Sequence, residues 1–239
     1  MSSKDVILGR VRSALGSGVA APEIPRAYRR GGAEADLELL VERLADYKAV
    51  VHRINPEKSP LGGEAAAGES EAAPNAGVAS GVADRAVPGR TGREAAAIRA
   101  AISGILGRGA VVVPPGLSKE WLPDGVEGVV DDGLSAERIA ATDGVVTAAA
   151  VAVAETGTIV LDASADQGRR IISLLPDLHI CVLRPEQVVA SVPEAVAQLD
   201  PTRPLTWISG PSATSDIELN RVEGVHGPRN LHVILLEAQ

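Results

Sequence analysis

From residue 110 onwards, short apolar runs alternate with helix-like stretches, and few folds accept that order. The apolar runs lie at 110–114, 125–130, 145–154, 159–162, 179–183, 205–209 and 231–237. Helix-like stretches lie at about 93–106, 135–140, 168–173 and 193–199. Strands joined through helices pair in parallel and need cover on both faces. We therefore predict an α/β fold with a mostly parallel sheet covered by helices on both faces.

The composition limits both the core and the partners. With two Trp, two Tyr and no Phe, the core is built from aliphatic side chains, and stacking of bases on aromatic rings is nearly excluded. A formal net charge of -8 repels nucleic acid and anionic lipid. Apolar runs fall short of the roughly 20 residues of a membrane span, and the N-terminus lacks a signal-peptide core. We expect a cytoplasmic protein with no membrane span.

The first 48 residues form an N-terminal helical arm in this interpretation. Helical spacing of apolar residues predicts helices at about 4–15 and 33–47, joined by a linker. The arm can pack on the main domain or extend to a partner. The α/β domain then covers 49–239, with a first strand at 49–54. An insertion at about 55–90, rich in Gly, Ala, Pro, Ser and Glu, has the composition of a flexible segment.

Cysteine and glycine patterns argue against a bound cofactor in this chain. Cys181 is the single cysteine, which excludes an internal disulfide and an all-cysteine cluster. The four histidines form no paired metal motif, so we expect no metal site. The segment 16–21, GSGVAA, matches a dinucleotide fingerprint in letters but follows a helix, which is the wrong context.

Polar residues gather after the run LTWIS, and they are the main candidates for a ligand site. If LTWIS is a strand, GPSATS is the turn at its carboxyl end and Ser215 to Glu218 is a capping box for a following helix. Such a layout directs backbone N–H groups into the crevice at the carboxyl ends of parallel strands. The candidate ligand-binding residues here are Gly210, Pro211, Ser212, Thr214, Ser215, Asp216, Glu218 and Gly227, with His226 available for proton transfer. Capping and turn chemistry alone also explains these residue types.

Two further breaks in the apolar pattern carry candidate residues. Glu155 interrupts an apolar run, so its carboxylate must be hydrogen-bonded, shifted in pKa or turned to a cleft. Thr156, Gly157 and Thr158 complete that ETGT segment as candidate ligand contacts. The alternative is a tight turn in which Gly157 supplies a positive φ. Arg169, followed by Arg170, is a candidate for a bidentate contact to a small carboxylate or other small anion, and a surface arginine pair is the alternative.

Four sequence blocks carry a resemblance to a known family. They are VVVPPGLSKEWLP at 111–123, AETGTIVL at 154–161, GRRIISLLPDLHICV at 168–182, and GPSATSDIE with GVHGPRNLHVILLE at the C-terminal end. Together, and in this order, they resemble the lactate-utilisation protein C family, the LUD-domain proteins. The resemblance covers about 93–237 closely and leaves out about 55–90.

The resemblance implies a fold like that of NagB, ribose-5-phosphate isomerase and the CoA transferases. It also implies a part in oxidising L-lactate to pyruvate alongside iron–sulfur partner proteins. Since fold relatives that transfer CoA use a glutamate nucleophile, the alternative is a stand-alone transferase or sugar-phosphate isomerase that acts through Glu155. A third interpretation is a scaffold without a working site.

Overall fold

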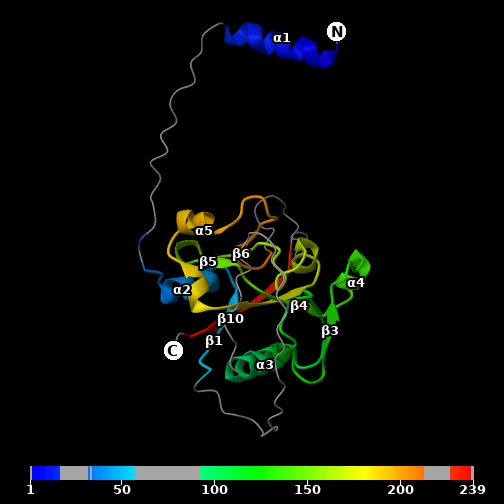
Figure 1. Ribbon diagram of the computed structural model, residues 1–239, viewed down its shortest axis with the longest axis vertical. Coiled ribbons are helices and arrows are strands. Elements are labelled where there is room, and N and C mark those ends of the chain that lie inside the picture. The colour runs from blue at the N-terminus through cyan, green and yellow to red at the C-terminus, as the bar shows by residue number, and fades with distance from the viewer. Residues whose placement is uncertain (1, 17–31, 33, 57–91, 213–226, 238–239) are drawn as a thin grey trace, which may run out of the picture.

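A six-stranded parallel sheet forms the centre of the molecule (Figure 1). The computed structural model describes residues 2–16, 32, 34–56, 92–212 and 227–237. Within them the strand order is β1-β10-β7-β4-β2-β3, and every neighbouring pair is parallel. The strands are β1 (Val50–Ile54), β2 (Gly109–Val113), β3 (Val126–Val130), β4 (Gly144–Ala148), β7 (Leu178–Leu183) and β10 (Asn230–Leu236). The predicted fold class is confirmed.

A second sheet of four strands differs from the prediction of one mostly parallel sheet. Its order is β8-β5-β6-β9, from β5 (Val151–Val153), β6 (Thr158–Leu161), β8 (Val188–Val189) and β9 (Thr206–Ile208). Strand β6 pairs antiparallel with both β5 and β9. The apolar run 145–154 is therefore two strands in two sheets, separated at Ala149 and Ala150. An apolar run shows that a strand is buried but not which sheet it joins.

Five of the expected helices form near the expected places, and the helix expected after Ser215 lies outside the described residues. The five helices are α1 (Ser3–Leu15), α2 (Leu37–Asp46), α3 (Gly92–Leu106), α4 (Ala136–Ala140) and α5 (Val192–Gln198). Four short 3₁₀ turns accompany them in the described residues: η1 (Lys119–Trp121), η2 (Ala154–Thr156), η3 (Arg170–Ser173) and η4 (Pro185–Gln187). The helix expected at 168–173 is thus a single 3₁₀ turn, which leaves Gly168 and Arg169 in the preceding loop.

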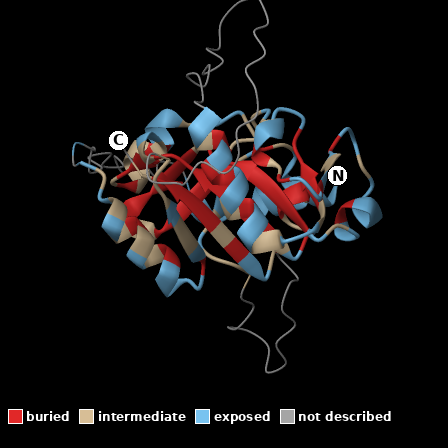
Figure 2. Cartoon of the chain, turned by 90° about the horizontal axis from the view of Figure 1, so that it is seen from below, coloured by how far each residue is buried: buried red, intermediate tan, exposed pale blue. Residues whose placement is uncertain are grey.

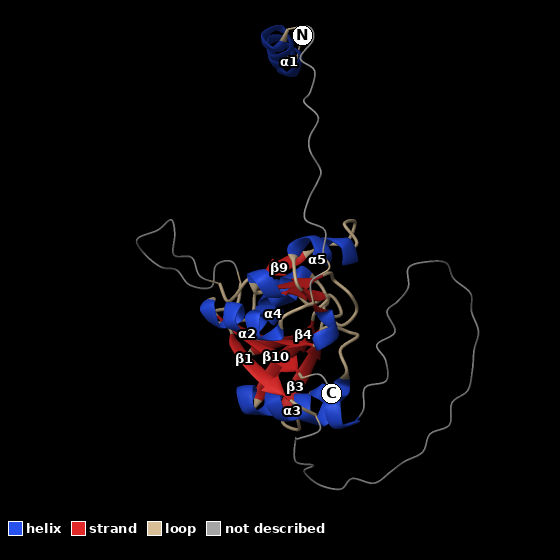
Figure 3. Ribbon diagram, turned by 90° about the vertical axis from the view of Figure 1, so that its left-hand side faces the viewer, coloured by secondary structure: helices blue, strands red, loops and turns tan. Residues whose placement is uncertain are grey.

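Both faces of the main sheet are buried, as Figure 2 shows for the central strands. Alternate residues of β7 and β10 point to opposite faces. Ile180 and Ile234 pack with α3, whereas Leu183 and Leu235 pack with α2 and with the second sheet. The helices α3 and α2 lie on opposite sides of the sheet in Figure 3. A further cluster joins the outer face of the second sheet to α5.

The two helices of the N-terminal arm behave differently. In α2, Leu40 and Leu44 are fully buried within the cluster that covers β7 and β10. Helix α2 therefore packs on the main domain, one of the two alternatives for the arm. Helix α1 begins with a capping box formed by Ser2 and Asp5, and none of its residues is buried. The predicted flexible insertion lies almost entirely outside the described residues, and the boundary at residue 48 stays a prediction.

Two glycine turns fit closely against the C-terminal end of α2. Gly157 has a φ of 59°, and a Cβ atom there would lie 2.6 Å from the Cβ of Arg43. Gly210 has a φ of 83°, and its Cβ would lie 2.6 Å from the carbonyl oxygen of Tyr47. The positive φ expected of Gly157 is confirmed. Helix α2 therefore rests on two turns that tolerate no side chain.

None of the helices in the described part of the chain combines the length and apolar content that a membrane span requires.

Replacing Gly157 with Ala tests this packing. We expect Gly157→Ala to lower the free energy of unfolding by at least about 1 kcal/mol, because a left-handed backbone and a contact with Arg43 both oppose a methyl group. The matched control is Gly104→Ala inside α3, where nothing lies within 4 Å of the new Cβ. We expect the free energy of unfolding of the control to rise by roughly 0.5–1 kcal/mol. Urea unfolding measures both, and an unchanged Gly157→Ala variant would contradict the packing described here.

Candidate functional site

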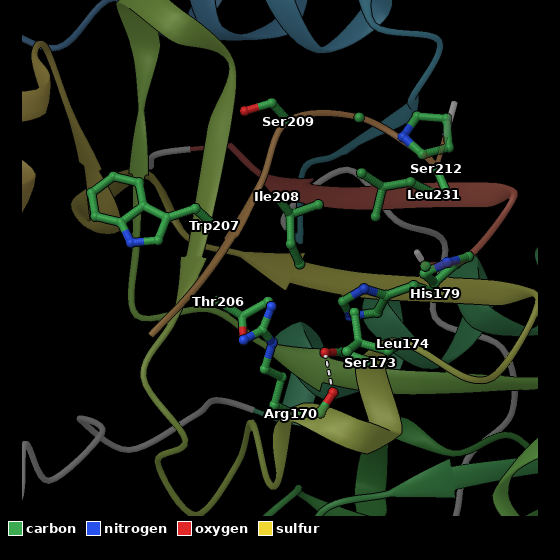
Figure 4. Close-up of a pocket in the computed structure, with 14 residues that line it drawn as sticks. Arg170, Ser173, Leu174, His179, Thr206, Trp207, Ile208, Ser209, Ser212 and Leu231 are labelled. Atoms are coloured by element: carbon green, nitrogen blue, oxygen red, sulfur yellow. Dashed lines mark hydrogen bonds between the residues drawn. The ribbon is translucent and has the colours of Figure 1, made fainter. Parts of the chain in front are cut away.

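A pocket of about 160 Å³ lies where η3, the starts of β7 and β10, and the end of β9 meet (Figure 4). Its apolar wall includes Leu174, Ile208 and Leu231, and Trp207 adds a half-exposed ring. Its volume is below the roughly 300–1,000 Å³ of typical drug-sized sites. The pocket therefore suits a ligand of only a few heavy atoms.

The pocket opens at the amino ends of the parallel strands, whereas the prediction placed a ligand crevice at their carboxyl ends. His179 and Leu231 are the second residues of β7 and β10. At the carboxyl ends of β2 and β4, the loop 162–168 closes the sheet. Gly116 N–H there donates to the Ala165 carbonyl at 2.8 Å, and Ala148 N–H donates to the Asp166 carbonyl at 3.0 Å. The prediction took the 205–209 run to be parallel, whereas β9 pairs antiparallel with β6 in the second sheet.

Four predicted residues line this pocket: Gly210, Pro211, Ser212 and Gly227. They come from the two ends of the final polar segment. The Ser212 backbone N–H donates to the carbonyl of Pro228 at 2.8 Å, which holds these ends together. The predictions for Thr214, Ser215, Asp216, Glu218 and His226 lie outside the described residues.

The threonines of the ETGT turn reach the pocket wall through a chain of hydroxyl groups. Thr156 Oγ1 donates to Thr158 Oγ1 at 2.8 Å, and Thr158 Oγ1 lies 2.8 Å from Ser209 Oγ. Ser209 lines the pocket. These threonines therefore orient a hydroxyl of the wall and do not line the pocket themselves.

Glu155 lies away from the pocket lining. Its Oε1 accepts a hydrogen bond of 3.0 Å from the backbone N–H of Val192, the first residue of α5. A carboxylate at a helix N-terminus satisfies a free N–H and interacts favourably with the helix dipole. This contact accounts for an acidic residue after a buried strand and gives no geometric support to Glu155 as a nucleophile in the pocket.

Of the two neighbouring arginines, Arg170 lines the pocket and Arg169 does not. Arg169 donates from Nε and Nη2 to the two carboxylate oxygens of Asp131, whose side chain is 1% exposed. The hydrogen bonds from Arg169 lower the pKa of Asp131, which keeps that buried carboxylate charged. The Arg169 charge is thus neutralised within the loop. Arg170 has no side-chain hydrogen bond or ion pair with any residue that the structure describes.

A buried histidine forms part of the pocket that sequence reasoning missed. His179 is 1% exposed, and its Nε2 lies 2.8 Å from Oγ1 of the fully buried Thr147 on β4. Burial lowers the pKa of His179 to about 4, so the ring is neutral at physiological pH. The available signal was a histidine inside the apolar run HICVL, since a polar side chain in a buried strand needs a reason.

Elsewhere, His52 and His232 stack across β1 and β10, with Nε2 and Nδ1 2.9 Å apart. Burial lowers the pKa of both rings. The described residues contain no cluster of three or more His, Cys, Asp or Glu side chains able to hold a metal ion. The pair therefore lacks a third ligand within the described chain.

The fold and the sequence blocks agree with comparisons to known proteins. A model of the LUD domain matches residues 131–236. Lactate utilization protein C of Deinococcus radiodurans is 52% identical over 148 residues, which cover 59% of this chain and 70% of that protein. The Bacillus subtilis protein of the same name is 33% identical over 50% of this chain and 55% of its own length. A crystal structure of a DUF162 family protein from Deinococcus radiodurans has a TM-score of 0.58 and 33% identity, and the match covers 84% of this chain and 96% of that chain.

An α/β domain with these blocks in this order defines the class of protein. The chain belongs to the LUD-domain family, as the resemblance predicted. The match spans 40% of the length of a relative from Oceanobacillus iheyensis, also called lactate utilization protein C. What these relatives do is therefore carried to this chain only as a proposal.

The buried histidine generates a prediction about pH and stability. Its pKa is 6.5 when exposed and about 4 in the fold, so the unfolded chain binds more protons between these values and stability falls as pH drops from 6.5 to 4. We expect up to roughly 3 kcal/mol of this loss to come from His179. The His52 and His232 pair contributes in the same direction.

Unfolding by urea at pH 7 and pH 4 measures the loss in the wild type and in His179→Gln. The variant should lose less stability than the wild type. Equal losses in both proteins would show that His179 does not titrate as a buried neutral ring.

Proposed function

We propose that this protein is a component of a system for L-lactate utilisation, acting in the cytoplasm with iron–sulfur partner proteins and binding a small carboxylate. The observation that carries the pathway is membership of the LUD-domain family together with the name of its relatives. The observation that carries the ligand is an arginine, Arg170, that lines a small pocket and forms no ion pair with any described residue.

The partners are proposed because this chain lacks the side chains for redox chemistry of its own. Protein-bound iron–sulfur clusters are held mainly by several cysteine thiolates, and the chain has one cysteine. That cysteine is buried, and burial raises its pKa to about 12, which leaves it a thiol. Electrons from lactate would therefore pass to clusters in other chains, and we propose no cofactor in this one.

The ligand proposed for the pocket is a small monoanion. Arg170 is the only charged residue among those that line it in the described chain, and no carboxylate faces it there. A guanidinium can hold a carboxylate with two parallel hydrogen bonds. The predicted role of Arg169 thus passes to its neighbour, since Arg169 is already paired with Asp131. The alternative stand-alone enzyme acting through Glu155 has no comparable support.

Growth of a deletion strain tests the pathway. Loss of the gene should slow growth on L-lactate and leave growth on pyruvate unchanged. A plasmid copy carrying Arg170→Gln should fail to restore growth, while Arg138→Gln on α4 makes the same charge change away from the pocket and should restore it. Normal growth of the deletion strain on lactate, with no second lactate dehydrogenase, would refute the pathway.

Affinity purification of the tagged protein from lactate-grown cells tests the partners. We expect iron–sulfur proteins to co-purify, with iron in the complex and none above background in the chain purified alone. About one equivalent of iron in the isolated chain would contradict the division of labour proposed here.

A further inference from the structure

Thr147 and His179 form a buried polar pair directly behind the pocket. Thr147 lies on β4 and His179 on the adjacent β7, where Val145 is the register partner of His179. The two side chains are 0% and 1% exposed, and Thr147 Oγ1 lies 2.8 Å from His179 Nε2. A polar contact this deep in a sheet of aliphatic side chains is costly unless both groups are satisfied.

The hydroxyl of Thr147 fixes which ring nitrogen of His179 carries the proton. A buried hydroxyl needs an acceptor, and two acceptors of the described residues lie within reach of this one: His179 Nε2, which is 2.8 Å away, and the sulfur of Cys181. The nearby thiol of Cys181 is a weak acceptor, and it is directed towards the carbonyl of Ala148. Because sulfur is the weaker acceptor, we assign the hydroxyl as the donor to Nε2, and this assignment puts the proton of the neutral ring on Nδ1.

The protonated Nδ1 is the polar atom that His179 offers to a ligand. The ring of His179 extends from β7 into the same space as the guanidinium of Arg170, which reaches up from η3 (Figure 4). Nδ1 has no hydrogen-bond partner in the described chain. The pocket thus presents a charged donor and a neutral donor side by side, with an apolar wall of Leu174, Ile208 and Leu231 around them.

We infer that the pocket selects short carboxylates that carry an oxygen on the carbon next to the carboxylate, the 2-oxo and 2-hydroxy acids. The carboxylate binds Arg170, and the adjacent oxygen accepts a hydrogen bond from Nδ1–H of His179. The wall takes a short alkyl group. This inference rests on the proposed binding of a small carboxylate and adds His179 as the residue that determines specificity, with Thr147 as its positioning residue.

The test is an NMR titration of the purified full chain with pyruvate, L-lactate and propionate, because propionate lacks the adjacent oxygen. In the wild type, we expect pyruvate and L-lactate to bind about fivefold or more tightly than propionate, the factor that one net hydrogen bond supplies. Arg170→Gln should weaken the binding of all three ligands. Thr147→Ser keeps the hydroxyl and should keep the preference.

The double variant Thr147→Val/His179→Leu removes both partners of the buried pair, so no unsatisfied group is left behind. It should bind propionate within about twofold of the wild type and lose the preference for the other two acids. Circular dichroism of each variant establishes that it is folded. If it is not folded, the Nδ1 resonance of wild-type His179 serves instead: it should shift on saturation with pyruvate and clearly less on saturation with propionate, and equal shifts would contradict the inference.

The outcomes separate this inference from the proposed function. If no carboxylate binds the wild type, both fail. If all three acids bind equally well and Arg170→Gln weakens them, the carboxylate site stands and the selectivity is wrong. If the double variant keeps the preference for pyruvate and L-lactate, another group forms the hydrogen bond to the adjacent oxygen.

Discussion

The apolar cluster between the main sheet and the second sheet holds the pocket together. The cluster is one buried core that contains Leu44 from α2, Ile159 from β6 and Leu231 from β10. Ile208 of β9 packs against the same cluster, and this contact places β9 over the starts of β7 and β10. The pocket is therefore a product of sheet-on-sheet packing, with α2 locking the glycine turns from outside.

The contrast between Arg169 and Arg170 shows how the fold assigns different tasks to neighbours. Asp131, at the end of β3, is buried and binds Arg169 through both oxygens, so this pair fixes the loop before η3. A buried carboxylate without its partner would be strongly destabilising. The 3₁₀ turn that follows then directs Arg170 into the pocket, where no described carboxylate competes with a ligand. One arginine organises the loop and the next remains available for binding.

Much of the fold could be predicted because local pattern and burial agree along the chain. The strand from 231 to 236 is apolar apart from His232 and lies inside the sheet, as its composition indicates. The second sheet could not be predicted, since β5, β6 and β9 are as apolar as the parallel strands and only their long-range partners distinguish them. For the site, Gly210 and Ser212 stand out in the sequence, whereas the choice of Arg170 over Arg169 depends on Asp131, which lies 38 residues away. The histidine in the apolar run HICVL indicates a buried polar group, but the sequence does not show that His179 lies beside Arg170, because the two residues meet only through the fold.

The proposed ligand contacts both a neutral His179, protonated on Nδ1, and the cation of Arg170. Nitrogen-15 NMR of the histidine rings tests this proposal directly, with His179→Gln used to assign the resonance. We expect a neutral ring with a protonated Nδ1 at pH 7, and an Nδ1 resonance that shifts on saturation with pyruvate in the wild type but stays in place in Arg170→Gln. A ring protonated on Nε2 would contradict this proposal. An Nδ1 resonance that does not shift when pyruvate binds to the protein would contradict it as well.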